Sequence, residues 1–469
     1  MSRRARCARR RQAGFTLVEL TVSLLAGLIV ALGIMTLSKE ATRTFNEEIR
    51  GSAAEATLRT AVDRLRADIG RAGYMSTGNI MLDPMIAKAP SDVSNVVHIA
   101  NGMGGIRRLA SVSFVAGKVG QSQALNTLPL SLVQPSALAP DMVEFSGNMT
   151  TSEQFEVQMI MPAGSNCTQI LLSSLSPAIY RMSPTGLGTP AASAELRNAF
   201  QPVPATLATQ FIVRLVDTTG HVQYLATCPN ATAAGFTGTQ PYLSVDTSST
   251  PIQTSAQTKT QGGASGYCVG CLVNPVQIVR WEVTSSTQEA SNQAQYAAAL
   301  DQQPTTFGSA TVDPAKYDLM RTYVDATGTP VLQTSEIIAE YAVDLKLAFS
   351  VDKTTLGDTQ PNIATLAFDD PTNATWAPDV SATPQLAAVG PQRIRSVRAR
   401  VATRAAQPDR TVNVPVTNFG AQQFTQTFLY RYCINAVPSC ATSDGTLRWA
   451  RARTVTTEIA LPNTSGAFY

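Results

Sequence analysis

An apolar stretch close to the amino terminus constrains this chain more than any other feature. Residues 15–37 read FTLVELTVSLLAGLIVALGIMTL and contain one ionisable side chain, that of Glu19. A helix of this length, at about 1.5 Å per residue, crosses a hydrocarbon layer of about 30 Å. The stretch therefore predicts one membrane-spanning helix with the rest of the chain outside the membrane.

The residues before this stretch form a short basic leader. Residues 1–14 contain six arginines and no acidic side chain, and such charge holds the flanking segment on the cytoplasmic side. A secretory signal peptide is cut after its apolar region, whereas here the sequence that resembles a cleavage site ends at Gly14, before that region. We therefore expect the apolar helix to survive processing and to begin at Phe15.

Glu19 is unusual because it lies within the apolar stretch. A carboxylate inside a bilayer costs on the order of 2–3 kcal/mol, and such groups are usually retained for a function with a defined partner. Cleavage between Gly14 and Phe15 would supply a partner, because it creates a positively charged amine on Phe15.

The run GFTLVEL at residues 14–20, behind a basic leader, resembles the processing motif of type IV pilins and pseudopilins. The resemblance implies that a prepilin peptidase cuts between Gly14 and Phe15 and methylates the new amino terminus. It also implies that Glu19 pairs with the terminal amine of a neighbouring subunit in a filament. The alternative is an uncleaved single-pass anchor whose Glu19 lies near the lipid headgroups.

A helical pattern continues beyond the membrane-spanning part. Residues 38–72 contain no proline, and charged side chains separate apolar residues at helical spacing. These apolar residues are Phe45, Ile49, Ala53, Leu58, Val62, Leu65 and Ile69. The pattern predicts one helix over 15–72, about 87 Å long, with a membrane half at 15–37 and an amphipathic half at 38–73 that packs on a sheet. A coiled coil with a separate partner is the alternative, but the heptad pattern is short and imperfect.

The remainder, residues 74–469, is predicted to be a β-rich globular region with large insertions. Short apolar or alternating runs bounded by turn residues indicate strands. They lie at 96–99, 112–115, 143–146, 155–161, 211–216, 222–226, 276–283, 341–352, 394–401 and 454–461. Residues 229–270 are rich in Thr, Ser, Gln, Ala and Gly and are predicted to be a loop or the edge of an inserted subdomain. The expected fold class is α+β, a long helix packed on an antiparallel sheet.

Six of the seven cysteines lie after the leader, an even number in a region that would face an oxidising compartment. The disulfide candidates are Cys167, Cys228, Cys268, Cys271, Cys433 and Cys440. Cys433 and Cys440 bracket a short loop and are the first pair we expect. Cys268 and Cys271 form a CxxC element typical of redox or zinc sites, but a single CxxC in a chain with two histidines favours disulfides.

Charge and motifs do not indicate an enzyme or a nucleic-acid-binding protein. Without the six leader arginines, 30 basic side chains face 33 acidic ones, so the basic excess belongs to the leader. No nucleophile elbow, Walker loop or HExxH motif is present, and no cofactor is expected. Five arginines between 393 and 404 raise DNA binding as an alternative, but without interleaved aromatics a solvated face or a subunit contact is favoured.

The end of the predicted helix, LRADIGRAGY at 65–74, also resembles PilW-type minor pilins. The resemblance implies a precursor in the bacterial inner membrane, with its carboxyl-terminal domain in the periplasm, that later joins a pilus at the cell surface. The implied partners are prepilin peptidase, the inner-membrane assembly platform, membrane lipid, the major pilin, other minor pilins and a tip adhesin. The implied role is to prime pilus assembly in a tip complex. A type II secretion pseudopilin, and a pilus-tip adhesin or DNA-binding minor pilin, remain as alternatives.

Overall fold

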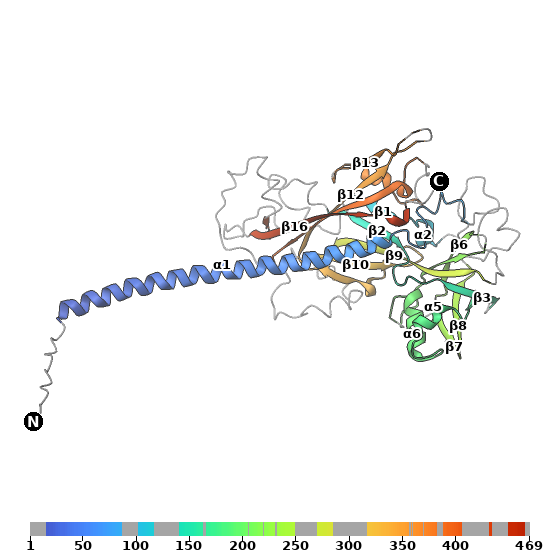
Figure 1. Ribbon diagram of the computed structural model, residues 1–469, viewed down its shortest axis with the longest axis horizontal. Helices are drawn as coiled ribbons and strands as arrows, with labels where there is room; N and C mark the ends of the chain where they lie inside the picture. Colours follow the sequence, from blue (N-terminus) through green and yellow to red (C-terminus); the bar gives the residue numbers. More distant parts are fainter. Residues whose placement is uncertain are drawn as a thin grey trace, which may run out of the picture. The chain divides into compact units, whose positions relative to one another are not determined.

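The computed structural model describes residues 16–86, 102–116, 140–162, 166–204, 206–218, 220–229, 232–248, 270–284, 317–355, 358, 360–368, 370–381, 388–405, 431–433 and 449–464. The chain divides into two compact units, residues 1–53 and 54–469, and the helix α1 (Leu17–Arg71) begins in the first and ends in the second. Figure 1 shows this helix in blue and the strands of the second unit in cyan to red.

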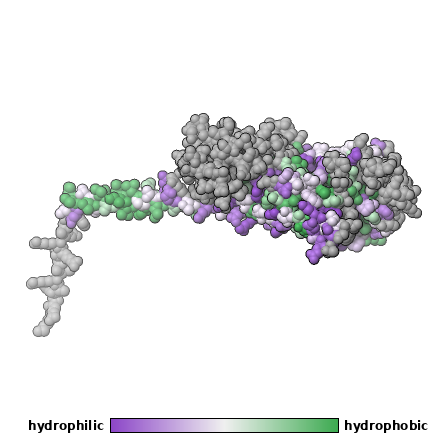
Figure 2. All heavy atoms as spheres, turned by 90° about the horizontal axis from the view of Figure 1, so that it is seen from above, coloured by the Kyte–Doolittle hydropathy of each residue, from purple (hydrophilic) through white to green (hydrophobic). Residues whose placement is uncertain are grey.

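In the first unit, the described chain is the amino-terminal part of α1. Its large apolar side chains between Leu17 and Leu37 are all more than half exposed. Figure 2 shows the resulting apolar surface in green along this part of the helix. Phe45 and Ile49, which we expected in the stripe that packs on a sheet, are also 62% and 50% exposed. The buried stripe therefore begins only at Leu58, and the prediction was wrong for its first three residues, Phe45, Ile49 and Ala53.

The second unit contains two antiparallel sheets that share one apolar core with the end of α1. In the first sheet the strands follow the order β1 (Val112–Val115), β2 (Met142–Gly147), β9 (Leu272–Thr284), β10 (Asp318–Val324) and β11 (Glu336–Ala339). In the second the order is β13 (Ile363–Thr365), β12 (Ala342–Asp352), β14 (Ile394–Arg404), β16 (Trp449–Ala460) and β15 (Arg431–Cys433).

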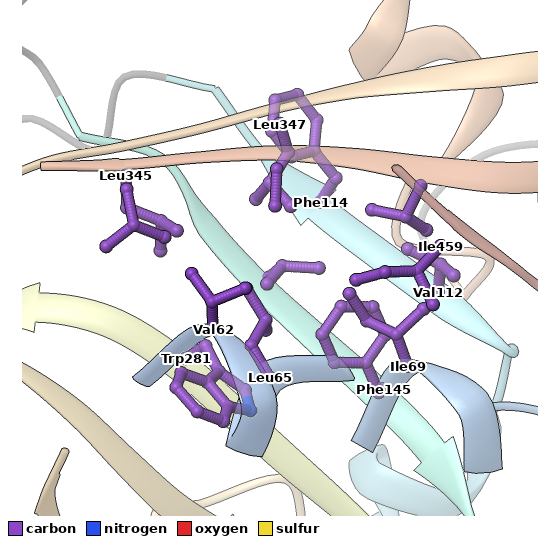
Figure 3. Packing of buried hydrophobic residues seen from close by; sticks show 14 of the residues in the cluster. Val62, Leu65, Ile69, Val112, Phe114, Phe145, Trp281, Leu345, Leu347 and Ile459 are labelled. Carbon is purple, nitrogen blue, oxygen red and sulfur yellow. The ribbon is translucent and has the colours of Figure 1, made fainter. Parts of the chain in front are cut away.

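The carboxyl-terminal part of α1 packs between these sheets. Val62, Leu65 and Ile69 are buried with residues of both sheets in one cluster, which includes Trp281 on β9 and Leu345 on β12. Figure 3 shows these side chains converging on the helix. Spacings of three and four residues place the buried positions on one face of the helix, so the amphipathic pattern that begins at Leu58 explains the packing.

A buried ion pair also joins α1 to the first sheet. The Asp68 carboxylate accepts hydrogen bonds from Arg321 Nε at 2.7 Å and from Trp281 Nε1 at 3.0 Å. Asp68 is 4% exposed and Arg321 is 1% exposed. Burial alone would lower the pKa of Arg321, but the charge of Asp68, together with Tyr323 and the hydrogen bonds to both side chains, raises it. The Arg321 guanidinium therefore stays charged inside the core.

A close approach of two backbones marks the end of α1. A Cβ atom on Gly147, the last residue of β2, would lie 2.3 Å from the Arg71 carbonyl oxygen, so only glycine fits. Gly73 has a φ of 75°, a conformation that glycine adopts without strain, and its amide donates to the Ser146 carbonyl at 2.8 Å. These contacts hold the end of the helix against the end of β2.

A ring of six antiparallel strands is inserted in the chain between β2 and β9. Its members are β3 (Phe155–Pro162), β4 (Cys167–Leu172), β8 (Gln240–Asp246), β6 (Val222–Thr227), β5 (Ile212–Val216) and the first part of β9. β7 (Ala234–Thr237) pairs with β8. The ring encloses its own apolar core, to which α5 (Pro177–Met182) and α6 (Pro190–Phe200) contribute. Figure 1 shows these two helices beside β7 and β8.

Short elements complete the described chain. They are α2 (Gly104–Arg107), α9 (Asn373–Trp376) and the 3-10 helices Leu332–Thr334, Pro391–Arg393 and Pro462–Thr464.

The expected α+β class, with an apolar amino-terminal helix and an antiparallel β-sheet domain, is confirmed. Strands lie at nine of the ten predicted places, and the tenth, 96–99, is outside the described residues. The segment 229–270, expected to be a loop or subdomain edge, contains β7 and β8. We did not predict β4, β10, β11, β13 or β15.

Candidate functional site at the start of the helix

The first turn of α1 is closed by a reciprocal pair of hydrogen bonds. The Leu20 amide donates to the Thr16 carbonyl at 3.1 Å, which makes Thr16 the residue that caps the helix. The Thr16 hydroxyl accepts from the Glu19 amide at 3.3 Å, and the Glu19 carboxylate accepts from the Thr16 amide at 3.0 Å. This is a capping box, which satisfies amides that the helix itself leaves without partners.

A third contact fixes the carboxylate of Glu19. The Thr16 hydroxyl donates to Glu19 Oε2 at 2.9 Å, so one carboxylate oxygen receives both the hydroxyl and the amide of Thr16. The negative charge also lies at the positive end of the helix dipole. Within one chain, Glu19 thus lies at the exposed amino-terminal end of an apolar helix and is held in a defined position.

Glu19 was predicted from the sequence as a site residue, whereas Thr16 was not. The signal was present, because Thr-x-x-Glu before an apolar run is the sequence pattern of a capping box. Gly14 and Phe15 lie outside the described residues, so their predicted role in processing stays a prediction.

The helix that follows is apolar enough to cross a membrane. The span Leu17–Thr42 is 26 residues long, and its most apolar 18 residues have a mean hydropathy of 2.4 and are not buried in the chain. An apolar surface of this size on a soluble monomer would be unusual. Length, composition and exposure together fit an environment of lipid or of other apolar helices.

One disulfide is described with both of its cysteines. Cys167 at the start of β4 is bonded to Cys228 after β6, with their Cα atoms 6.2 Å apart. Both β4 and β6 pair with β8, so this bond joins the two neighbours of one strand of the ring.

The other candidate cysteines are described only in part. Cys271 is also disulfide-bonded. Cys268 and Cys440 lie outside the described residues, and Cys433 is placed only as the last residue of β15. The expected pairing of Cys433 with Cys440 therefore stays a prediction. Among the residues described, no three His, Cys, Asp or Glu side chains come together as a metal site.

The arginines between 393 and 404, which raised the alternative of DNA binding, have partners within the chain. Arg395 contacts Asp352 at 2.9 Å and Arg400 contacts Asp344 at 2.9 Å. Arg398 and Arg400 both lie over the ring of Phe368, at 5.1 and 5.3 Å. Arg393 donates to the carbonyl of Thr354, and Arg404 lies over the ring of Tyr341. These side chains stabilise the second sheet, and their charges do not form a free row for phosphate groups.

A buried cluster of charges accompanies these arginines. Asp344 and Lys346 on β12 are 1% and 5% exposed, and Lys346 contacts Asp141 at 3.2 Å. Burial raises the pKa of Asp344 to about 7, against the opposing charges of Arg400 and Lys346. The cluster lies on the face of β12 that points away from the apolar core, which explains why its strands alternate apolar and charged residues.

The chain matches the family described as "Prokaryotic N-terminal methylation motif" over residues 9–35. This match covers the end of the basic leader, Gly14, Phe15, the capping box and most of the apolar stretch. The chain thus carries the N-methylation motif of prokaryotic prepilin-like proteins, which supports a type IV pilin-like or pseudopilin-like protein. No curated protein matches the chain. No solved structure matches it.

Proposed function

We propose that this chain is a minor pilin of the PilW type, which joins a type IV pilus through its amino-terminal helix and has a mechanical role rather than a catalytic one. The observation that carries the proposal is the methylation motif at 9–35, which extends into a helix whose large apolar side chains between Leu17 and Leu37 are all exposed in the single chain. Association of such helices would bury the apolar surface. The motif also implies contact with the machinery that assembles pilins.

Glu19 has two roles in this proposal. Within its own chain it closes the capping box with Thr16. In the filament it would pair with the amine of Phe15 on a neighbouring subunit after cleavage following Gly14. Because an unpaired charge is costly to bury, a subunit displaced along the helix axis would be disfavoured, and the pair would set the register.

The position of the subunit is inferred from the size of its globular part. Residues 54–469 form a large unit with an inserted ring of strands. Repetition of so large a unit along a shaft would crowd its neighbours, which favours a tip complex with other minor pilins and an adhesin. The subunit would prime assembly there after waiting in the inner membrane with its globular part in the periplasm.

The test combines intact mass with assembly. The wild type and the variants Glu19→Ala and Glu55→Ala are each produced from the full-length sequence and isolated from the native membrane. Glu55 lies on the same helix and pairs with Arg59 at the surface, so it controls for loss of a carboxylate. We expect a mass without residues 1–14 plus one methyl group, loss of surface pili in Glu19→Ala, and normal pili in Glu55→Ala.

Two other outcomes would change the conclusion. A full-length mass would contradict processing at Gly14 and leave a single-pass anchor. A processed chain whose loss stops export of secreted enzymes and leaves pili intact would assign it to a type II secretion system as a pseudopilin.

A further inference from the structure

A buried lysine and a buried aspartate form a contact between the two sheets. Lys346 lies on β12 of the second sheet, and Asp141 directly precedes β2 of the first sheet. Lys346 Nζ is 3.2 Å from Asp141 Oδ1, and the two residues are 5% and 2% exposed. They are 205 positions apart in the sequence, so a covalent bond between them would tie distant parts of the chain together.

Backbone hydrogen bonds hold Asp141 beside Lys346. The Asp141 amide donates to the Leu345 carbonyl at 2.7 Å, and Asp141 Oδ2 accepts from the Leu347 amide at 3.0 Å. Figure 3 shows the side chains of Leu345 and Leu347 in the apolar core. Because side chains alternate along a strand, Lys346 points to the opposite face. The carboxyl group of Asp141 is thus fixed against the lysine, and the Leu347 N–H polarises it.

A second buried carboxyl group, that of Asp344, lies on the same face of β12 as Lys346, because residues two apart in a strand share a face. Asp344 Oδ2 contacts Arg400 at 2.9 Å, whereas Asp344 Oδ1 has no hydrogen-bond partner among the described residues. Burial raises the pKa of Asp344 to about 7 against the charges of Arg400 and Lys346, and the charge of Asp141 adds to the increase. A carboxyl group with this pKa can both accept and release a proton near neutral pH.

These three groups are the ones that amide formation requires. We propose that Lys346 Nζ and Asp141 Cγ form an isopeptide bond in the folded chain, with Asp344 as the carboxyl group that transfers a proton. The Lys346 ammonium gives one proton to Asp344, the resulting amine attacks Asp141 Cγ, and the bond between Cγ and Oδ1 breaks. Oδ1 leaves as water, with one proton from Asp344 and a second from the attacking nitrogen. One ammonium and one carboxylate thus give one amide and one water, and no oxidant or other reactant is consumed.

The fold favours this reaction over a lasting ion pair. A buried amine and a buried acid are less costly to the protein in their neutral forms than as ions. Groups held about 3–3.5 Å apart react as if at effective concentrations of about 10⁵–10⁸ M. The bond would tie the first sheet to the second, and it involves neither α1 nor cleavage at Gly14. The inference therefore goes beyond the proposed function and stands apart from it.

The test is peptide mapping by mass spectrometry of the full-length chain from its native cells. The protein is reduced and denatured first, which breaks disulfides and ion pairs but leaves amides intact. Trypsin is then expected to release residues 119–181 joined to residues 322–353, uncut after Lys346 because that lysine is acylated. The joined species should be about 18 Da lighter than the sum of its two peptides, since one water is lost.

Three variants test the roles of the groups. Lys346→Arg keeps the positive charge beside Asp141 but removes the amine, so no joined species is expected. Asp344→Asn removes the group that accepts the proton and is expected to slow the appearance of the joined species after synthesis by about a hundredfold. Lys353→Arg is the matched control, because Lys353 is an exposed lysine just after β12, and it should leave the joined species unchanged.

A wild-type chain that is cut after Lys346 and releases residues 119–181 alone would overturn the isopeptide bond and leave an ion pair. This result needs only the wild type, so it holds even if a variant fails to fold. An unchanged rate in Asp344→Asn would refute proton transfer by Asp344. The intact mass of the same sample separates this inference from the proposed function. An unprocessed chain with the joined species would refute the pilin function alone, and a processed chain without it would refute the isopeptide bond alone.

Discussion

At the scale of single residues, Asp68 is the side chain on which the attachment of α1 to its sheet depends most. Asp68→Ala would leave Arg321 charged, buried and without the carboxylate that now lies 2.7 Å away. Breaking one side of a buried ion pair costs about 3–5 kcal/mol. We expect the free energy of unfolding of the full chain in detergent, measured with urea, to fall by about this amount. Asp63→Ala, which changes an exposed carboxylate on the same helix, should change it by less than about 0.5 kcal/mol.

Asp344 predicts a dependence of stability on pH. Its pKa is raised to about 7 in the folded chain from an ordinary value of 3.8, so between these values the folded state binds a proton that the unfolded state has released. The resulting contribution to the free energy of unfolding is complete below about pH 4 and is lost as the pH rises through about 7. Between these pH values the free energy of unfolding falls by up to about 1.4 kcal/mol per pH unit. Relative to Asp344→Asn, the wild type should lose stability between pH 5 and pH 8 in urea titrations. A constant difference across this range would show that Arg400 keeps Asp344 ionised throughout.

At the scale of secondary structure, the capping box makes the first turn of α1 depend on one hydroxyl group. Thr16→Val keeps the shape of the side chain but removes its contacts with the Glu19 amide and carboxylate. Loss of an N-cap costs about 0.5–2 kcal/mol, so amides of the first turn should exchange with solvent about two- to thirtyfold faster in micelles. Thr21→Val is the control, because the Thr21 hydroxyl only donates to the Val18 carbonyl. Equal exchange in the two variants would contradict the cap.

The elements also show what periodicity can and cannot predict. The helix and most strands could be predicted because runs such as 341–352 alternate regularly. β10, which reads DLMRTYV, was missed because Arg321 interrupts its apolar pattern, and its burial depends on Asp68, which is 253 residues away. The alternating pattern of β12 likewise suggests that its polar face is exposed to water. Asp344 and Lys346 on that face are instead buried and paired with charged side chains of other elements. Such pairings are set by tertiary contacts, which local pattern does not encode.

At the candidate site, Glu19 was evident as a charge in an apolar run, and Thr16 required the capping pattern.

At the scale of the whole molecule, separate apolar cores imply that stability is not uniform. The ring of strands encloses one cluster, and the two sheets enclose another with the end of α1. The disulfide between Cys167 and Cys228 spans a sequence separation of 61 residues in the ring, and neither cysteine belongs to the cluster between the two sheets. Local opening free energies should therefore differ between the two regions.

Replacing both cysteines should destabilise the ring selectively. For a loop of this length, the chain-entropy relation gives a stabilisation of about 4 kcal/mol by the disulfide. This is the largest loss of stability that we expect in the ring when Cys167→Ala and Cys228→Ala are combined. Hydrogen exchange of the full chain in detergent should then show faster exchange for amides of β4, β6 and β8. Amides of β12 and β14 should keep their protection, because the charges and apolar residues that hold them lie in the other cluster. An equal loss of protection in both regions would mean that the ring and the sheets unfold as one unit, since β9 passes through both.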